Sequence, residues 1–164
     1  MTLAVGERFP DATLARMGEN GPELVQMGDV LKGRKVVVFG LPGAYTGPCS
    51  TIHVPSFVRT AKDFAAHGVD EIVCISVNDP FVLKAWGEAT GATAAGITLL
   101  GDPDAVLTKA LGMEFTAPPI GLYNRSNRYA LLIENRVIRV ANVDEPATCK
   151  ISVGEELLAA MEAA

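Results

Sequence analysis

Two continuous apolar runs, separated by a helical pattern, restrict the fold of this chain more than any other feature. Residues 35–40 and 71–77 are rich in β-branched side chains, as strands covered on both faces are. Between them, apolar side chains recur mostly at three- and four-residue spacing, which predicts one buried helical stripe that ends near Gly68. The side chains of this stripe are Ile52, Val54, Phe57, Val58, Ala61, Phe64 and Ala65. A strand, a helix and a strand in this order predict a parallel strand pair.

Later helices are predicted from residues that cap helix ends. Asp79 and Pro80 predict the start of a helix over 81–90, and residues 102–104 predict the start of a helix over 105–111 that stops at Gly112. Ser152 and Glu155 form a capping box. The capping box begins the last helix, whose apolar side carries Leu157, Leu158 and Met161.

The later strands complete a mixed sheet. Residues 97–100 predict a brief strand, and residues 129–133 and 137–143 predict a hairpin in which Asn135 takes a positive φ. Parallel strands early and an antiparallel hairpin late indicate an α/β fold, with a mixed central sheet flanked by helices on both faces. Because no repeat, low-complexity tract or charged linker interrupts residues 1–164, we expect one domain.

Composition excludes several classes of function. The net charge of −5 leaves no basic surplus that would hold a phosphate backbone, so we expect no nucleic-acid partner. The first residues lack a cationic segment followed by an apolar one, and glycine and proline interrupt the longest apolar run, residues 36–45. We therefore expect a soluble cytoplasmic chain without a membrane partner.

Cysteine is scarce, which limits the chemistry to isolated thiols. Cys49, Cys74 and Cys149 are too few and too far apart for a disulfide framework or a four-ligand zinc site, and the only histidines are His53 and His67. We expect no metal or other cofactor and a reducing compartment.

Cys49 is the thiol that the sequence places in a reactive setting. The preceding residues, 40–48, contain two prolines and three glycines, and Pro48 suits the first position of a helix. Cys49 is therefore expected in the first helical turn, where unpaired backbone N–H groups and the helix dipole favour a thiolate.

Thr46 lies three residues before this thiol and can offer its hydroxyl to the sulfur or to an oxygen approaching it. The spacing is that of a Cys-x-x-Cys site with Thr46 replacing the first cysteine, so an oxidised Cys49 would await another thiol. The alternative is that Thr46 caps the helix and Cys49 is an inert apolar residue.

The segment 42–50 resembles the peroxiredoxins, in particular their type II or peroxiredoxin-five subfamily. The family motif Pro-x-x-x-Thr-x-x-Cys is met by Pro42, Thr46 and Cys49, and the likeness continues through residues 68–79, 85–87 and 124–129. The resemblance implies a thioredoxin-like fold and a peroxide site formed by these three residues and a distant arginine. From the residues alone Arg125 and Arg128 are nearly equal candidates, and the resemblance indicates Arg128.

The resemblance implies a thiol peroxidase that reduces hydrogen peroxide and organic hydroperoxides. The Cys49 thiolate would attack one peroxide oxygen, and Thr46 and Arg128 would stabilise the breaking O–O bond. An external thiol, from glutathione with glutaredoxin or from thioredoxin, would reduce the resulting sulfenic acid. The alternatives are a thiol-disulfide oxidoreductase and a non-catalytic holdase or binding module on the same fold.

Five further residues complete the predicted site. Pro48 departs from the family because it has no backbone N–H for the peroxide, and Tyr45 replaces the usual Phe and adds a hydroxyl to the pocket wall. We expect His53 to pack against or tune the site, since an ionised thiol needs no base. The resemblance further implies that Ile120 and Leu122 rim the pocket and contribute to a homodimer.

The other two cysteines receive structural interpretations. Cys74 lies within an apolar strand and is interpreted as core, as is Trp86 on its helix. Cys149 follows a polar connection near the last helix, where some relatives carry a resolving cysteine. We interpret Cys149 as non-resolving and keep the resolving role as the alternative.

Overall fold

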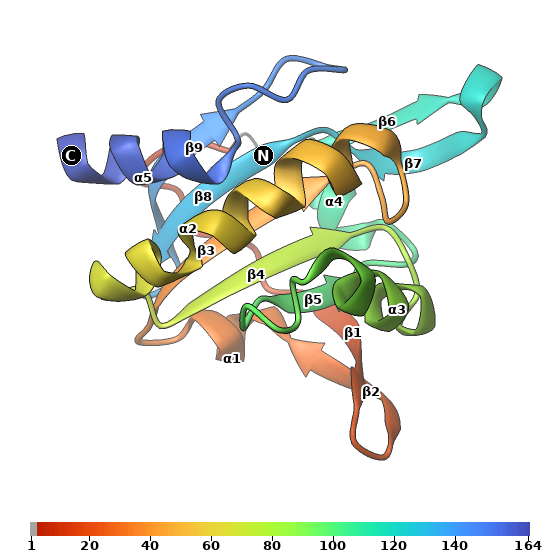
Figure 1. Ribbon diagram of the computed structural model, residues 1–164, viewed down its shortest axis with the longest axis horizontal. Coiled ribbons are helices and arrows are strands. Elements are labelled where there is room, and N and C mark those ends of the chain that lie inside the picture. The colour runs from red at the N-terminus through yellow and green to blue at the C-terminus, as the bar shows by residue number, and fades with distance from the viewer. Residues whose placement is uncertain (1–2) are drawn as a thin grey trace.

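The structure is a computed structural model that describes residues 3–164. A seven-stranded mixed sheet lies at its centre (Figure 1). Its strands, in spatial order, are β2 (Gly21–Gln26), β1 (Thr13–Gly18), β5 (Thr98–Gly101), β4 (Glu71–Ser76), β3 (Lys35–Leu41), β8 (Tyr129–Glu134) and β9 (Val137–Val143). Two further strands, β6 (Glu114–Ala117) and β7 (Leu122–Ser126), form a separate hairpin that projects from the sheet.

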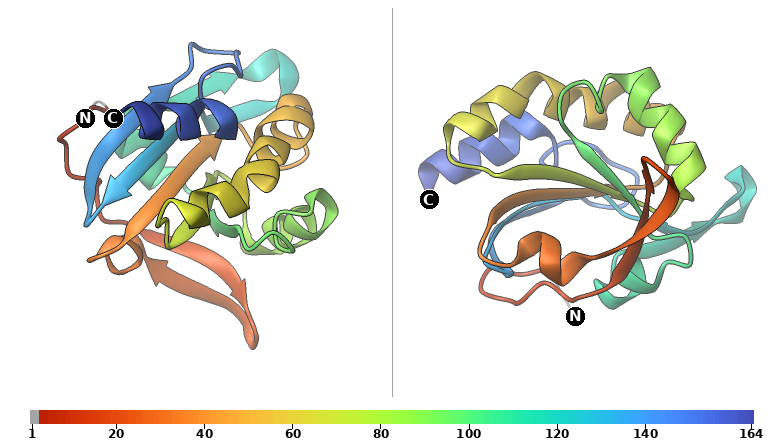
Figure 2. Two further views of the ribbon diagram at one scale, coloured as in Figure 1. Left: turned by 60° about the vertical axis from the view of Figure 1, so that its left-hand side comes forward. Right: turned by 90° about the horizontal axis from the view of Figure 1, so that it is seen from below.

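Helices cover both faces of this sheet, which confirms the predicted fold class (Figure 2). They are α1 (Met27–Leu31), α2 (Val54–Ala66), α3 (Pro80–Thr90), α4 (Val106–Ala110) and α5 (Gly154–Ala163), with a π-helical turn over Cys49–His53 and a 3-10 turn over Pro118–Ile120. Helices α2, α3 and α5 cover one face, while α1 and α4 lie on the other. None of the described helices combines the length and apolar character that crossing a bilayer requires.

Strand β3 lies at the centre because both of its faces are apolar. Val37 and Phe39 belong to one core cluster and Val36 and Val38 to the other, which explains the continuous apolar run. β3 pairs in parallel with β4 and antiparallel with β8, as predicted. The carboxyl end of β3 and the start of β8 therefore meet at one edge of the sheet.

The predicted helix ends at Gly68, Asp79 and Asp102 agree with the structure, in which the Asp102 carboxylate accepts the Leu107 and Thr108 N–H groups of α4. The predicted start of the last helix does not. The Asp79 side chain accepts a hydrogen bond from the Val82 N–H at the start of α3, and α2 ends just before Gly68. The capping box is wrong: the Ser152 hydroxyl donates to Asp144, and Val153 occupies the cap position of α5 without a side-chain bond. Glu155 instead forms an ion pair with Arg59 at 3.0 Å.

Candidate active site

The loop after β3 is held in place by contacts from two other segments. The Ala44 N–H donates to Asn78 Oδ1 at 2.9 Å, and Arg125 Nη1 donates to the Pro42 carbonyl at 3.0 Å. A side chain at position 43 would collide with the Arg125 guanidinium, which explains why this position is glycine. The loop thus delivers the chain to the start of the next helix in one fixed path.

Cys49 lies in the first turn of that helix, as predicted, and is fully buried. Gly47 and Pro48 are already helical, and residues Cys49–His53 then form a π-helical turn closed by the Val54 N–H bonding to the Cys49 carbonyl. Such single π turns are rare and are frequently found at functional sites. Apolar spacing alone could not show this turn, because one extra residue barely changes the pattern.

Arg128 reaches the Cys49 sulfur from the neighbouring strand. It directly precedes β8, whose Tyr129 is paired with Gly40 at the end of β3, and its Nη1 donates to Cys49 Sγ at 3.0 Å. A side chain at Gly40 would overlap the Tyr129 ring, so glycine permits this close approach. The structure therefore brings Arg128 to the thiol, while Arg125 tethers the loop.

His53 is a buried neutral histidine that contacts Arg128. Its Nε2 lies 2.9 Å from the Ser152 carbonyl, which can only accept, so Nε2 carries the proton and Nδ1 accepts from Arg128 Nη1 at 3.4 Å. Burial and the Arg128 charge lower the pKa of His53 to about 3. The ring also packs against Phe39 and Phe57, with centroids 5.1 and 5.7 Å away. The predicted packing role has a structural basis, and the predicted tuning of the site stays a prediction.

Thr46 is oriented differently from the expectation. Its hydroxyl donates to the Gly43 carbonyl at 2.7 Å, so its hydrogen is not offered to the sulfur and its oxygen lone pairs remain as acceptors. The tight turn before the helix brings the carbonyl within reach. Tyr45 and Pro48 are exposed at the surface of the same loop.

The two other cysteines differ in their surroundings. Cys74 is buried in β4, and burial followed by the nearby Cys49 raises its pKa well above the ordinary value, which confirms a core position. Cys149 is half-buried between β9 and α5; burial raises its pKa, and Arg128 acts in the opposite direction.

Ile120 and Leu122 lie on the projecting β6–β7 hairpin (Figure 1). Ile120 is 71% exposed and Leu122 is half-buried. The hairpin tip points away from the sheet. The place of Ile120 and Leu122 at the rim of the pocket therefore stays a prediction.

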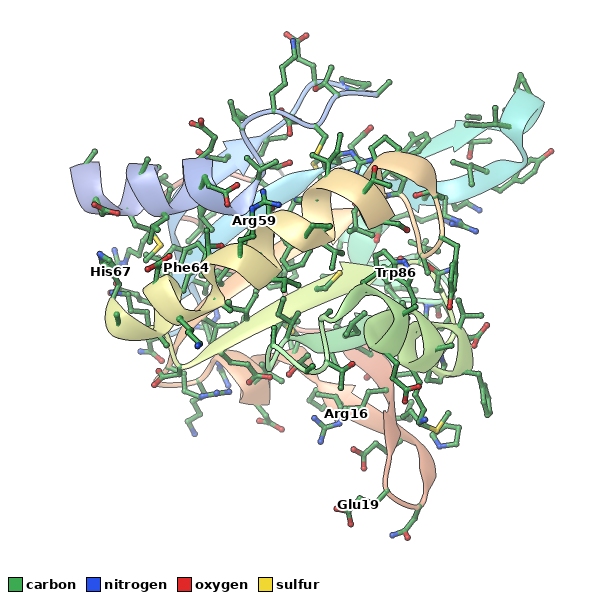
Figure 3. The ribbon with its side chains drawn as sticks, viewed as in Figure 1. Arg16, Glu19, Arg59, Phe64, His67 and Trp86 are labelled. Carbon is green, nitrogen blue, oxygen red and sulfur yellow. The ribbon has the colours of Figure 1, made fainter. Side chains whose placement is uncertain are left out.

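Trp86, labelled on α3 in Figure 3, was predicted as a core residue and is fully buried, and it also contacts Ser50. Its indole Nε1 donates to Ser50 Oγ at 2.9 Å, and Ser50 follows Cys49 in the chain. Nothing in the sequence pattern links α3 to this turn. The contact makes the single tryptophan a neighbour of the turn that carries Cys49.

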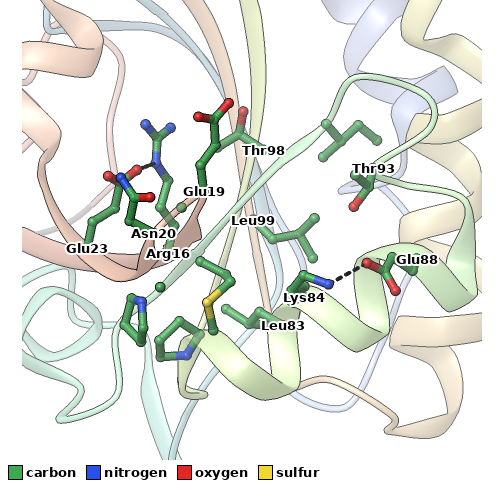
Figure 4. Close-up of a pocket in the computed structure, with 16 residues that line it drawn as sticks. Arg16, Glu19, Asn20, Glu23, Leu83, Lys84, Glu88, Thr93, Thr98 and Leu99 are labelled. Carbon is green, nitrogen blue, oxygen red and sulfur yellow. Dashed lines mark hydrogen bonds and ion pairs between the residues drawn. The ribbon is translucent and has the colours of Figure 1, made fainter.

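A large open groove lies elsewhere, between the β1–β2 hairpin and α3 (Figure 4). Its volume is about 680 Å³, and its charged side chains include the ion pairs Arg16–Glu23 and Lys84–Glu88. The residues that line it include no cysteine or histidine. The groove therefore offers none of the thiols or imidazoles that make up the candidate site around Cys49.

Buried His53 makes folding stability depend on pH. An unfolded histidine has a pKa near 6.5, whereas that of folded His53 is about 3. Between these values the unfolded chain binds a proton that the folded chain does not, so stability falls as the pH decreases through this window. We expect His53→Gln to reduce the slope of unfolding free energy against pH by about 1.4 kcal/mol per pH unit. Urea unfolding at several pH values measures this slope.

The exposed histidine provides a matched control. His67→Gln makes the same substitution at an exposed position away from the site. Asp144, another group near His53 with a shifted pKa, acts at more acidic pH. The hydrogen bonds that its carboxylate accepts outweigh its burial and lower its pKa, so its contribution to folding stability is lost only as the pH falls through the pKa of the folded state. A wild-type slope in His53→Gln above about pH 4.5 would contradict a neutral buried His53.

Comparisons with known proteins show the family to which this chain belongs. Residues 4–158 match the model of the Redoxin family. Peroxiredoxin-2E-2, chloroplastic, from Oryza sativa is 44% identical over 98% of this chain and 73% of its own length. Peroxiredoxin-2D from Arabidopsis thaliana is 39% identical over 97% and 98% of the two chains.

Solved structures give the same result. The structure of reduced Prx3 in complex with H₂O₂ from Vibrio vulnificus has a TM-score of 0.92 and 41% identity, and covers 98% of this chain and 99% of that one. Peroxiredoxin 5 from Alvinella pompejana has a TM-score of 0.85 and 30% identity, with coverage of 98% and 99%. This chain therefore belongs to the peroxiredoxins, in the type II or peroxiredoxin-five subfamily of the thioredoxin-like superfamily, and is a thiol-dependent peroxidase.

Proposed function

We propose that Cys49 is the thiol that attacks the peroxide. The observation that carries this proposal is the 3.0 Å contact between Arg128 Nη1 and Cys49 Sγ in the first turn of a helix. An adjacent guanidinium and the positive end of the helix both favour a thiolate. The sulfur electron pair forms a bond to one peroxide oxygen as the O–O bond breaks. The other oxygen takes a proton and leaves as water or an alcohol, and Cys49 becomes a sulfenic acid.

The groups around the sulfur match the charges of this step. A guanidinium has five N–H donors, and Arg128 uses those of Nη1 on Cys49 and His53, which leaves the remaining donors for the oxygen that gains negative charge. The Thr46 oxygen, whose own hydrogen lies on Gly43, accepts the hydrogen of the incoming peroxide. The Cys49 N–H supplies the backbone donor that Pro48 lacks. In this proposal Pro42 anchors the loop through its carbonyl.

Burial of Cys49 favours small substrates over protein disulfides. The sulfur is fully covered, so any substrate needs a local opening, and hydrogen peroxide or an organic hydroperoxide needs a smaller one than a large protein partner. The similar Vibrio vulnificus protein was solved with hydrogen peroxide. We therefore prefer the peroxidase to the thiol-disulfide oxidoreductase and to the holdase or binding module.

The proposed reductant is an external thiol, from glutathione with glutaredoxin or from thioredoxin. Because the Cys49 sulfur is buried, the first turn has to open before such a thiol can reach it. Three free cysteines suit a reducing compartment, and we propose the cytoplasm, although some relatives are named for the chloroplast or mitochondrion. We also propose that residues 1–164 act as one domain.

A homodimer through the β6–β7 hairpin is the proposed assembly. Ile120 is 71% exposed and Tyr123 is 60% exposed, and Arg125 connects the same hairpin to the Cys49 loop. On the adjoining loop, Tyr45 is 60% exposed. Apolar groups gathered in this way are typical of protein interfaces. Sedimentation of wild type and Ile120→Glu tests the assembly: a wild-type monomer would refute it.

Stopped-flow measurement of peroxide consumption tests the proposed function. Trp86 fluorescence is expected to change when peroxide is added to the reduced protein, because the indole bonds to Ser50 beside the oxidised sulfur. The signal should return when glutathione with glutaredoxin, or thioredoxin, is supplied. Insulin reduction without peroxide consumption would instead support the oxidoreductase.

Cys149→Ser should keep full peroxide turnover with a small thiol reductant. This result is expected because a non-resolving Cys149 takes no part in reducing the Cys49 sulfenic acid. Mass spectrometry of the wild-type protein during turnover provides the second measurement. A disulfide between Cys49 and Cys149 would show that Cys149 resolves the intermediate.

A further inference from the structure

Asp144 organises the segment between β9 and α5 without touching the reactive sulfur. Its carboxylate accepts the N–H groups of Lys150, Ile151 and Ser152 at 3.0, 3.0 and 3.1 Å, and also the Ser152 hydroxyl. Four bonds to one carboxylate fix the path of residues 150–152. They thereby fix the direction of the Ser152 carbonyl.

This segment is connected to Arg128 twice. The Asp144 N–H donates to the Arg128 carbonyl at 3.0 Å. The Ser152 carbonyl accepts the His53 Nε2 hydrogen at 2.9 Å, and His53 Nδ1 faces Arg128 Nη1 at 3.4 Å. The bonds form a closed ring from the Arg128 backbone through Asp144, Ser152 and His53 to the Arg128 side chain.

The ring has no gap in its hydrogen bonding. Among the described residues, no buried side-chain nitrogen or oxygen is without a partner. A fully satisfied buried network holds its members in one arrangement. The Ser152 carbonyl selects the His53 tautomer, and that tautomer presents a lone pair to the nitrogen that contacts Cys49.

We propose that Asp144 and Ser152 are positioning residues for Arg128, acting through His53. The inference depends on the proposed role of Arg128 at the Cys49 thiolate. Asp144 and Ser152 set the Ser152 carbonyl, the carbonyl sets His53, and His53 holds Arg128 Nη1 against Cys49 Sγ. Without the ring, the guanidinium keeps its charge but loses its fixed place.

The competing explanation is that Asp144 acts only through its charge. The charged and titratable groups around the thiol site are Arg128, His53, Cys149 and Asp144, together with Cys74 on β4. Removing a negative charge near a thiol favours the thiolate, so a pure charge effect moves the Cys49 titration to lower pH. Loss of the Arg128 contact moves it to higher pH. The two explanations therefore predict opposite signs.

Asp144→Asn is compared with Glu145→Gln, which removes an exposed carboxylate one position along the chain. The Cys49 titration is followed by the ultraviolet absorbance of the thiolate, in Cys149→Ser backgrounds so that one accessible thiol is observed. We expect Asp144→Asn to titrate at higher pH and to react with hydrogen peroxide about tenfold more slowly, as for other mutations that act through bonded networks. Glu145→Gln should match its parent in both measurements. A titration at unchanged or lower pH in Asp144→Asn would overturn the proposal.

Ser152→Ala is the milder variant if Asp144→Asn fails to fold. It removes one bond of the ring and leaves the backbone intact, so the same direction of change with a smaller size is expected. His53→Phe keeps a ring between Phe39 and Phe57 and removes both of its bonds. Combining it with Ser152→Ala should add nothing to the effect of His53→Phe alone, whereas additive effects would show that Ser152 acts by another route.

Failure of the proposed function is distinguishable from failure of this inference. If the wild-type protein does not consume peroxide, the peroxidase role of Cys49 is wrong. The thiolate titration needs no substrate, so its direction in the Asp144 and Ser152 variants still decides whether the ring positions Arg128.

Discussion

Cys49→Ser is expected to abolish peroxide turnover. Serine offers an alcohol oxygen in place of sulfur, and an alcohol oxygen does not attack a peroxide O–O bond at a useful rate. The substitution replaces one sulfur atom by oxygen and leaves the loop, the helix start and Arg128 in place. Loss of turnover therefore reports on chemistry and not on folding, which circular dichroism of the variant checks.

The other cysteines supply the controls for this experiment. Cys149→Ser is predicted to retain turnover with a small thiol, and Cys74→Ala changes a buried strand residue, so its effect should fall on stability. In the wild-type protein, mass spectrometry after one equivalent of peroxide should locate the added oxygen on Cys49. Turnover that survives in Cys49→Ser would contradict the proposed mechanism and revive the holdase or binding module.

The parts of the site that could be predicted from the sequence depend on local chain geometry. The apolar run of β3, the turn-rich loop and Pro48 together place Cys49 in the first helical turn, because each acts on the backbone of its own neighbours. The hairpin of β8 and β9 was predicted for the same reason, and Asn135 has the expected positive φ of 44°. Such features need no knowledge of the rest of the chain.

The parts that were missed depend on contacts between distant segments. The direction of the Thr46 hydroxyl is set by the turn that brings the Gly43 carbonyl next to it, and residue type alone does not reveal that direction. Asp144 comes directly after β9 and gives no pattern of its own, yet it closes a ring with Arg128 and His53. The β1–β2 hairpin was also missed, because its edge strand is largely exposed and contains Pro22, which weakens the apolar alternation of a strand.

Arg128→Ala is expected to slow peroxide attack by about a hundred- to a thousandfold, the usual cost of removing one donor from a preorganised site. The variant removes both the charge beside Cys49 Sγ and the donors proposed for the leaving oxygen. Arg128→Lys restores the charge without the planar fork and should recover part of the rate, mainly through the thiolate. The second-order rate constant for the reduced protein is read from Trp86 fluorescence at several pH values.

Arg125→Ala is the matched control, since both arginines approach the same loop. Arg125 donates to the Pro42 carbonyl and not to the sulfur, so its removal loosens the loop and should cost far less than removal of Arg128. The pH dependence separates the two contributions of Arg128. At a pH where Cys49 is ionised in every variant, differences in the thiolate fraction no longer affect the rate constant. The loss of rate that persists in Arg128→Ala then measures stabilisation of the breaking O–O bond. Equal deficits in Arg125→Ala and Arg128→Ala under that condition would mean that loop geometry, and not the guanidinium at the sulfur, controls the reaction.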